Sequence, residues 1–330
     1  MDLQTRVFDD VAQMLPSEAN PSPMVRINRL NPLADAYSLY AKLEWMNPFG
    51  SVKDRAAARI LRDLEERGEI GPARPGRTII EPTSGNTGLS LAALAASRGI
   101  PMHAVMPSKA PIEKQVLLRL CGADLDVVDD SYTSAVELGN GPIGMARTQA
   151  AADPERRVMP DQYQNRMNTR AHAETTGPEI WRQTAGRVTH VFLALGTAGT
   201  AMGLAEFLKS KNPGVKVVAA MPDSDHDVPG VRNASELRVS GLFDRSKLDE
   251  VIELDGELAF TAAAELCRGE GLLAGPSSGL IFEAARRYLR REGERVAGGV
   301  GVCIFCDSVF KYISSMVKHL PELGVLSLES

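Results

Sequence analysis

The chain has 330 residues, of which 44% are hydrophobic and 24% are charged, and its formal net charge is −5. This composition is typical of a globular protein with enough apolar residues for two packed lobes or one large domain. The acidic charge balance argues against a general nucleic-acid-binding protein. The sequence has no apolar run of about 18 residues, no signal-peptide pattern and too few cysteines for a disulfide framework. We therefore expect a cytoplasmic protein without a membrane span.

In chain order, short apolar segments alternate with amphipathic ones. Residues 1–36 predict a short helix and a Pro-rich turn, and residues 222–245 an irregular excursion. By their hydrophobic spacing, strands are predicted at 37–45, 77–81, 102–106, 124–128, 188–194, 216–221 and 301–305. Helices are predicted at 55–67, 89–97, 112–121, 140–152, 168–184, 201–209, 258–269, 280–291 and 309–319. The alternation indicates parallel βαβ units in an α/β protein.

The segment that joins the first strand to the first long helix, residues 47–55, reads NPFGSVKDR. Pro48 and Gly50 predict a turn between the strand and the helix. Ser51 can cap the helix, which places Lys53 in the first helical turn. A helix start disfavours positive charge, which favours a neutral amine able to form a Schiff base with an aldehyde. The alternative is a solvated surface lysine, and this segment alone does not decide between the two.

Residues 196–200 read GTAGT and lie between a buried strand and a helix. Glycines let backbone N–H groups converge, the hydroxyls add donors, and a helix N-terminus favours a dianion. The spacing is neither that of a Walker loop nor that of a dinucleotide-binding turn. The segment therefore predicts a phosphate site, with an ordinary tight turn as the alternative.

Residues 83–88, TSGNTG, occupy the same kind of junction. Hydroxyls, an amide and glycines at a helix start suit a carboxylate ligand, although simple helix capping is the alternative. Asp307 and Ser308 follow the last strand and make a third junction, and ligands of open α/β sheets bind outside such strand ends. An amine, a phosphate site and a carboxylate site together describe a pyridoxal-phosphate site.

The motifs lie in one order along the chain: NPFGSVKDR at 47–55, EPTSGNTG at 81–88, TTGPEI at 175–180, GTAGT at 196–200, GPSSG at 275–279, and Asp307-Ser308. With them, residues 24–318 resemble the fold type II (β-family) pyridoxal-phosphate enzymes, in the cysteine synthase and cystathionine β-synthase branch. The resemblance implies two open three-layer αβα lobes with mostly parallel sheets, like the tryptophan synthase β-subunit. It also implies a homodimer, a smaller mobile substrate-side lobe at 47–156, and a larger cofactor-binding lobe at 1–46 and 157–330.

The resemblance assigns roles to single positions. Lys53 would form the Schiff base with pyridoxal 5′-phosphate and act as acid and base, and Asn86 would hydrogen-bond the cofactor's 3′ oxygen. Ser308 would contact the pyridine nitrogen, and Gly230 would border the active site. The phosphate would be held by Gly196, Thr197, Ala198, Gly199 and Thr200. The substrate α-carboxylate would be held by Thr83, Ser84, Thr87 and Gln162.

The implied reaction is a β-replacement through an α-aminoacrylate. The donor would be O-acetyl-L-serine or O-phospho-L-serine, and sulfide would give L-cysteine. Homocysteine, giving cystathionine, and an amino-acid nucleophile, giving a diaminopropionate-type product, stay open as alternatives. So do an elimination-only serine or threonine deaminase and a non-catalytic protein that docks a partner. Retention of Lys53, Asn86 and Ser308 counts against the non-catalytic alternative.

Some positions depart from the family pattern. Phe49 stands where a small residue or threonine is common, which predicts a narrower substrate pocket. Residues 108–111 also differ from the family pattern, so the identity of the second substrate stays open. Residues 161–165 and 307–309 look more like the cystathionine β-synthase branch.

Two further patterns favour structural interpretations. Cys303 lies in the last predicted strand and Cys306 directly follows it, three positions later. This spacing favours two buried core residues over a redox pair. His226 lies among acidic residues, where a solvated loop is favoured over a cation site, and no zinc-ligand spacing is present.

Overall fold

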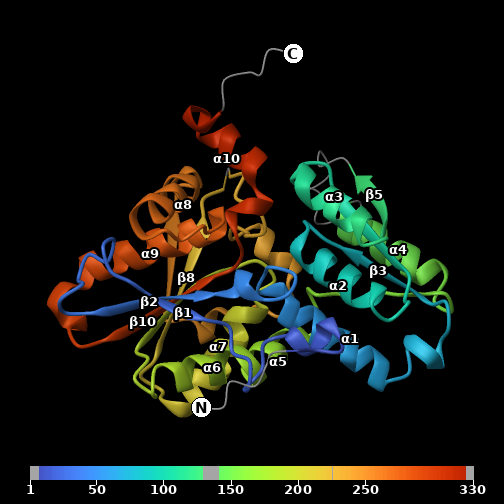
Figure 1. Cartoon of the computed structure of the whole chain (residues 1–330), viewed down its shortest axis with the longest axis horizontal. Helices are drawn as coiled ribbons and strands as arrows, with labels where there is room; N and C mark the ends of the chain where they lie inside the picture. Colours follow the sequence, from blue (N-terminus) through green and yellow to red (C-terminus); the bar gives the residue numbers. More distant parts are fainter. Residues whose placement is uncertain (1–6, 129–140, 225, 325–330) are drawn as a thin grey trace.

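The computed structural model describes residues 7–128, 141–224 and 226–324, which form two lobes (Figure 1). The strands are β1 (Met24–Ile27), β2 (Ser38–Leu43), β3 (Thr78–Pro82), β4 (Met102–Pro107), β5 (Asp124–Val128), β6 (Arg157–Val158), β7 (His190–Ala194), β8 (Lys216–Pro222), β9 (Glu250–Leu254) and β10 (Val300–Phe305). The helices are α1 (Lys53–Glu66), α2 (Asn86–Ala96), α3 (Ile112–Leu120), α4 (Pro142–Ala152), α5 (Arg166–Ala171), α6 (Gly177–Gln183), α7 (Gly199–Lys211), α8 (Glu257–Glu270), α9 (Pro276–Glu292) and α10 (Ile313–His319).

Each lobe is built on its own sheet. The larger sheet has six strands in the order β1-β2-β10-β7-β8-β9, and the smaller has four in the order β5-β4-β3-β6. Neighbouring strands are parallel except β1 and β2, which are antiparallel. Parallel neighbours need long crossover connections, and the helices supply them.

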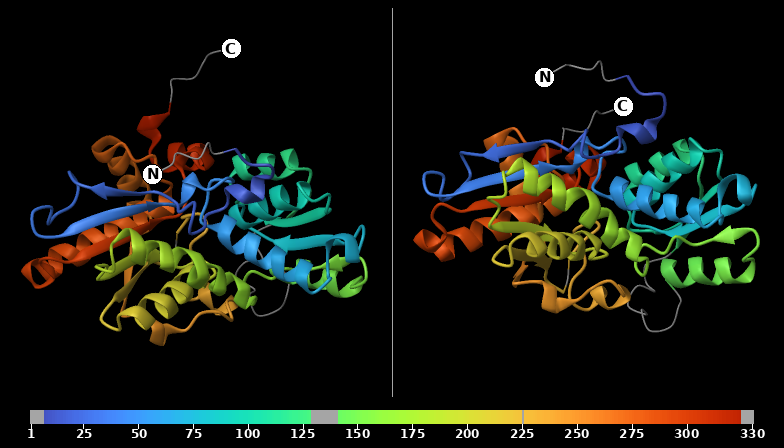
Figure 2. Two further views of the ribbon diagram at one scale, coloured as in Figure 1. Left: turned by 60° about the horizontal axis from the view of Figure 1, so that its bottom comes forward. Right: turned by 90° about the horizontal axis from the view of Figure 1, so that it is seen from below.

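Helices cover both faces of the larger sheet. Along β7, Phe192 faces the cluster that contains α8 and α9, whereas Val191 and Leu193 face the cluster that contains α6 and α7. Figures 1 and 2 show these two helix groups on opposite sides of the sheet. Burial on both faces explains why β7 is apolar from Val191 to Ala194 rather than alternating.

The smaller sheet is also covered on both faces. In β3, Ile79 packs with α1, α2 and α3, and the next residue, Ile80, packs with Ala146 of α4 on the other face. The two lobes are therefore three-layer αβα units with mostly parallel sheets, as predicted.

Several elements differ from the sequence prediction. The helix expected at 168–184 is interrupted by a π-helical turn at His172–Thr176, and the last helix is split into a 3₁₀ turn, η9 (Val309–Lys311), and α10. Strands β1, β6 and β9 were not among the predicted strands, because each gains its hydrogen bonds from a partner elsewhere in the sequence. In the described part of the N-terminal segment, the expected helix is only a short 3₁₀ turn, Val11–Met14.

The division of the chain at 47–156 stays a prediction. The strands of the smaller sheet lie between Thr78 and Val158, so β6 lies just beyond that boundary. None of the helices in the described segments combines the length and the apolar character that a membrane crossing requires.

Candidate active site

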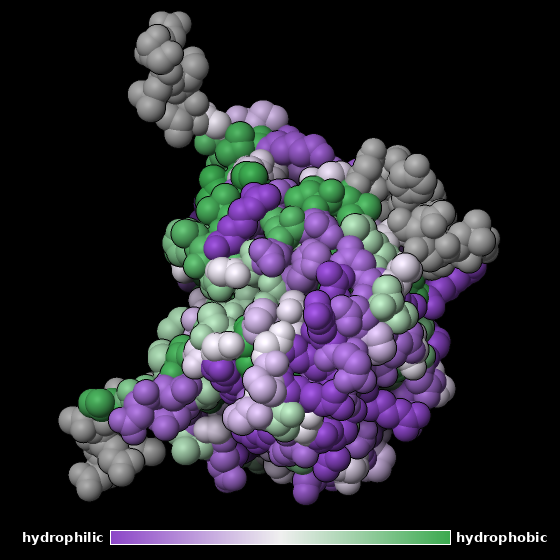
Figure 3. Space-filling view, turned by 90° about the vertical axis from the view of Figure 1, so that its right-hand side faces the viewer, coloured by the Kyte–Doolittle hydropathy of each residue, from purple (hydrophilic) through white to green (hydrophobic). Residues whose placement is uncertain are grey.

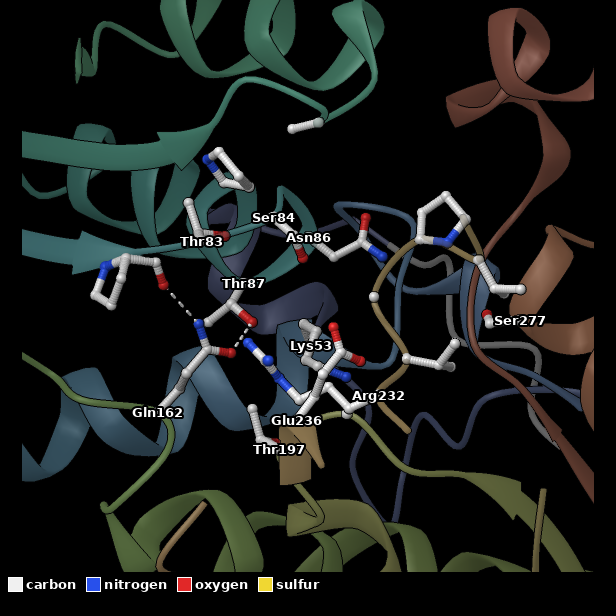
Figure 4. A pocket seen from close by; sticks show the side chains of 18 of the residues that line it. Lys53, Thr83, Ser84, Asn86, Thr87, Gln162, Thr197, Arg232, Glu236 and Ser277 are labelled. Carbon is white, nitrogen blue, oxygen red and sulfur yellow. Dashed lines mark hydrogen bonds between the residues drawn. The ribbon is translucent and has the colours of Figure 1, made fainter. Parts of the chain in front are cut away.

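A cavity of about 990 Å³ is lined by residues of both lobes (Figure 4). It lies beyond the carboxyl ends of three strands, where Thr83 follows β3, Gly196 follows β7 and Cys306 follows β10. This is the position expected for the ligand site of an open α/β sheet. Its volume is near the upper end of the range for small-molecule sites, roughly 300–1,000 Å³.

Lys53 is the first residue of α1 and lines the cavity. The helix start is fixed to the larger lobe, because the Val52 N–H donates to the Cys306 carbonyl at 2.8 Å. The half-buried Lys53 side chain has no hydrogen-bond or ion-pair partner among the described residues. An unpartnered amine in a cavity is available for covalent bonding to a carbonyl compound.

The turn before Lys53 is held by the buried carboxylate of Asp54. Its Oδ2 accepts the Phe49 N–H at 2.8 Å, and its Oδ1 accepts hydrogen bonds from Ser51 Oγ at 3.2 Å and Ser90 Oγ at 2.6 Å. Burial raises the pKa of this carboxyl to about 6. Phe49 itself packs against the core of the smaller lobe and does not line the cavity, so the narrower pocket predicted from it is not found.

The turn between β7 and α7 has the features of a phosphate cradle. A Cβ on Gly196 would lie 2.5 Å from the Gly230 carbonyl oxygen, and a Cβ on Gly199 would lie 2.0 Å from Asn168 Oδ1, so both positions need glycine. Ala198 has a φ of +65°, and no acidic residue lies in the first turn of α7. Gly196, Thr197, Ala198 and Thr200 line the cavity, whereas Gly199 is buried behind them. An uncapped helix N-terminus without nearby negative charge suits a phosphate.

Two side chains that the sequence analysis missed support this turn. Asn168 Nδ2 donates to Thr197 Oγ1 at 2.8 Å, and His172 Nε2 lies 3.2 Å from Thr200 Oγ1. Burial, with help from the charge of Arg55, lowers the pKa of His172 to about 3, so this imidazole is neutral near pH 7. The helical spacing of 168–184 gave no sign that these residues contact a loop 30 residues away.

The second predicted junction, between β3 and α2, forms another wall of the cavity (Figure 4). Thr83 Oγ1 accepts the N–H groups of Gly85 and Gly88, each at 3.0 Å, which shapes the loop. Thr87 Oγ1 donates to Gln162 Oε1 at 2.6 Å, and the Ser84 hydroxyl is exposed. The structure therefore brings together all four residues predicted to bind a carboxylate, although their role stays a prediction.

Ser308 follows β10, as predicted, and its contact with the cofactor ring stays a prediction. Its hydroxyl accepts the Phe310 N–H and caps η9, and it does not line the cavity. The buried hydroxyl that lines the cavity here belongs to Ser277, at the start of α9. We therefore name Ser277 as a second candidate for the contact with the cofactor ring. The GPSSG motif was the signal that could have identified it.

Gly230 lines the cavity with a φ of +80°, as expected of a residue in the excursion that borders the site. Two residues later, Arg232 also reaches into the cavity (Figure 4). Arg232 Nη2 donates to Tyr163 Oη at 3.0 Å, and its guanidinium lies 5.0 Å from the Tyr163 ring centroid. Among the described residues, no carboxylate makes an ion pair with Arg232. No motif in the sequence pointed to Arg232.

The remaining candidates are structural in the described part of the chain. Cys303 is fully buried and Cys306 lines the cavity; both are free thiols, and burial raises the pKa of Cys306 to about 11. His226 is not solvated, since its side chain is 6% exposed and its Nε2 lies 3.2 Å from Glu236 Oε2. The described residues contain no cluster of three or more His, Cys, Asp or Glu side chains able to hold a metal ion.

Comparison with known families identifies the class of protein. The family model described as "Pyridoxal-phosphate dependent enzyme" matches residues 16–307, and the chain belongs to this family. The cofactor prediction is thereby confirmed, and the residues present fit it. Lys53 supplies the amine, the 196–200 turn suits the phosphate, and Ser277 supplies a hydroxyl on the cavity wall.

Similarity to curated proteins narrows the resemblance. The chain is 38% identical over 298 residues to cysteine synthase B of Salmonella typhimurium, which covers 90% of this chain and 93% of that protein. It is 35% identical over 297 residues to cysteine synthase of Aquifex aeolicus, covering 89% and 88%. The resemblance to fold type II, cysteine synthase-like enzymes is confirmed.

Solved structures agree with this fold. The crystal structure of O-ureido-L-serine synthase superimposes with a TM-score of 0.83 at 31% identity, covering 95% of this chain and 96% of that one. O-acetyl serine sulfhydrylase isoform 3 from Entamoeba histolytica gives a TM-score of 0.82 at 27% identity, covering 99% and 95%.

Proposed function

We propose that this protein catalyses β-replacement on an activated L-serine with sulfide and so makes L-cysteine. The observation that carries the proposal is the unpartnered Lys53 amine, in one cavity with the 196–200 turn and the 83–88 loop. The similarity to proteins named cysteine synthase supports the same reaction.

Different residues of the chain have different roles in the proposed reaction. Bound pyridoxal phosphate supplies the electron sink for cleavage at the substrate α and β carbons. Lys53 removes and returns the α-proton, since its amine is not held by another group. Ser84, Thr87 and Gln162 orient the substrate carboxylate, while Asn86 and Ser277 hold the cofactor ring.

Arg232 favours O-phospho-L-serine over O-acetyl-L-serine as the donor. Among the described residues its guanidinium makes no ion pair, although Glu236 attracts it, and in a site walled by protein it gains most from a doubly charged ligand that accepts two parallel hydrogen bonds. A neutral acetyl ester offers no such partner. Arg232→Ala should raise the KM for the phosphoester at least tenfold, or about 1.4 kcal/mol. The KM for the acetyl ester should stay within a few fold of the wild-type value. Arg290→Ala, an exposed arginine outside the cavity, is the matched control.

An amino-acid nucleophile is the second candidate, because the cavity is cationic although the whole chain is acidic. Among the described residues, its lining holds seven Lys and Arg side chains (Lys53, Lys109, Lys114, Arg147, Arg232, Arg238 and Lys318) against three Asp and Glu side chains (Asp227, Glu236 and Asp307). Sulfide needs neither this volume nor this charge. An α-amino acid with a second carboxylate would use both, and its product would be of the diaminopropionate type.

We also propose a homodimer. Exposed apolar side chains lie on α3, η9 and α10, namely Ile112, Val116, Leu120, Phe310, Ile313 and Val317. Figure 3 shows apolar side chains gathered in the upper part of one face of the molecule. A patch of this kind marks an interaction surface in soluble proteins. Light scattering after gel filtration should show a dimer, and Leu120→Glu, at a residue 77% exposed, should shift it to monomer.

A cytoplasmic location is the remaining part of the proposal. The four cysteines are all free, which suits a reducing compartment. Fractionation of cells that express a tagged full-length chain tests it.

Product analysis tests the central reaction. The cofactor-loaded protein is incubated with O-phospho-L-serine or O-acetyl-L-serine and with sulfide, homocysteine or L-glutamate, and the products are separated by mass spectrometry. The proposal expects L-cysteine from the phosphoester and sulfide. A larger adduct formed only with an amino-acid nucleophile would move the function to the second candidate, and pyruvate without any adduct would indicate a deaminase.

A further inference from the structure

Lys114 is a buried lysine that the proposed reaction does not use. It lies in the first turn of α3 in the smaller lobe, and its side chain is 2% exposed. A Cβ on Gly85 would lie 2.1 Å from Lys114 Cδ, so the lysine side chain packs directly on the 83–88 loop. Within the described residues, no carboxylate lies in ion-pair distance of its ammonium group.

The Lys114 ammonium instead contacts a tyrosine of the other lobe. Lys114 Nζ lies 2.8 Å from Tyr312 Oη and 4.2 Å from the centroid of that ring. Tyr312 Oη donates its proton to the carboxylate of Asp307, so it can only accept from Lys114. Asp307 follows β10 in the larger lobe and is fully buried.

The Asp307 carboxylate also contacts the smaller lobe, through Asn86. Asn86 Nδ2 lies 2.5 Å from Asp307 Oδ2, while Asn86 Oδ1 lies 3.4 Å from Lys311 Nζ. Both ends of the Asn86 amide are therefore set by residues of the larger lobe. Lys114, Tyr312, Asp307 and Asn86 form what we name the lobe-bridging cluster.

The charges of the cluster depend on one another. Burial lowers the pKa of Lys114 to about 8, opposed by the attraction of Asp307, and raises the pKa of Tyr312 well above its usual value. Asp307 Oδ1 is buried without a hydrogen-bond partner. A buried carboxylate that is only partly satisfied relies on the nearby cations, so loss of the Lys114 charge would weaken the hold on Asn86.

We propose that Lys114 is a positioning residue, which acts through Tyr312 and Asp307 to fix the Asn86 amide in the orientation that meets the cofactor ring. The inference rests on the proposed role of Asn86 toward the cofactor. It gives α3 a part in cofactor binding through residues of the larger lobe.

Lys114→Met and Tyr312→Phe test the proposal, because each keeps the shape of its side chain and removes the polar group. Each should alter the visible absorption of the bound cofactor without substrate. Each should also raise the cofactor's dissociation constant, measured by fluorescence with the apoprotein, by about three- to tenfold, the value of one hydrogen bond. The double variant should bind the cofactor no more weakly than the weaker-binding single variant, since both side chains act in one series of hydrogen bonds. Lys247→Met, on the surface, is the control.

The result that overturns the proposal is an unchanged spectrum and dissociation constant in Lys114→Met, or single effects that multiply in the double variant. Lys114→Arg, which keeps the charge and the donor, should restore most of the binding. These measurements need neither donor nor nucleophile. They therefore hold or fail separately from the proposed function, which the product analysis tests.

Discussion

Arg55 and Glu179 form a buried, bidentate ion pair that ties the helix of Lys53 to the larger lobe. Arg55 Nη1 lies 2.7 Å from Glu179 Oε1, and Arg55 Nη2 lies 2.8 Å from Glu179 Oε2. Both side chains are 1% exposed. Lys42 Nζ also lies 2.7 Å from Glu179 Oε2, and the buried Glu44 pairs with Arg55 as well, so two carboxylates balance two buried cations.

Glu179→Gln should therefore destabilise the protein by about 3–5 kcal/mol, because it leaves Lys42 and Arg55 with too little negative charge in a buried site. Chemical denaturation measures the change. The matched control is Glu155→Gln, which removes the exposed pair with Arg74 and should cost less than about 1 kcal/mol. Equal effects of the two variants would show that the buried cluster does not secure the helix.

Glu81 predicts a pH dependence of stability. Its two oxygens accept the N–H groups of Asp161 and Gln162 at 2.9 and 3.0 Å, and burial raises the pKa of its carboxyl from 4.5 to about 8. Between these two pH values the folded state binds more protons than the unfolded state, so stability falls as pH rises.

As the pH rises through that window, Glu81 should lower the free energy of unfolding by at most about 1.4 kcal/mol for each pH unit. Glu81→Gln cannot titrate, so the stability of the wild type minus that of this variant should fall from pH 5 to pH 8. The exposed Glu322→Gln should follow the wild type in parallel. A constant difference between wild type and Glu81→Gln would contradict the raised pKa.

Gly199→Ala tests whether the 196–200 turn holds the phosphate. The added methyl would overlap Asn168 Oδ1 and displace either the turn or the Asn168 amide that bonds Thr197. The dissociation constant of pyridoxal phosphate should rise at least tenfold, or about 1.4 kcal/mol. Gly214→Ala, whose methyl would lie 3.1 Å from a surface asparagine oxygen, should bind the cofactor like the wild type. Unchanged binding in Gly199→Ala would remove the turn from the cofactor site.

Ser277→Ala and Ser308→Ala decide which hydroxyl meets the cofactor ring. Ser277 lines the cavity and Ser308 does not, so only Ser277→Ala should change the visible absorption of the bound cofactor and the rate of turnover. The reverse result would favour Ser308, the assignment made from the sequence.

The sequence predicts most of this architecture because its signals are local. The alternation of strands and helices follows from hydrophobic spacing, and Lys53 and the 196–200 turn follow from the junctions between a strand and a helix. The family motifs then identify the cofactor.

What the sequence does not predict depends on contacts between distant segments. Ser277 and Ser308 both follow turn signals, and only the approach of α9 to the end of β10 decides which one faces the cavity. Asn168 and His172 look like ordinary helical positions until the 196–200 turn packs against them. Strand β9 exists only because β8 supplies its partner.

The most direct test of the account is to locate the amine that holds the cofactor. Borohydride reduction of the cofactor-loaded protein fixes the cofactor to that amine, and peptide mass spectrometry then identifies the labelled lysine. The account predicts a single label on Lys53, absent in Lys53→Ala. A label on Lys114, Lys311 or any other lysine in the wild type would contradict it.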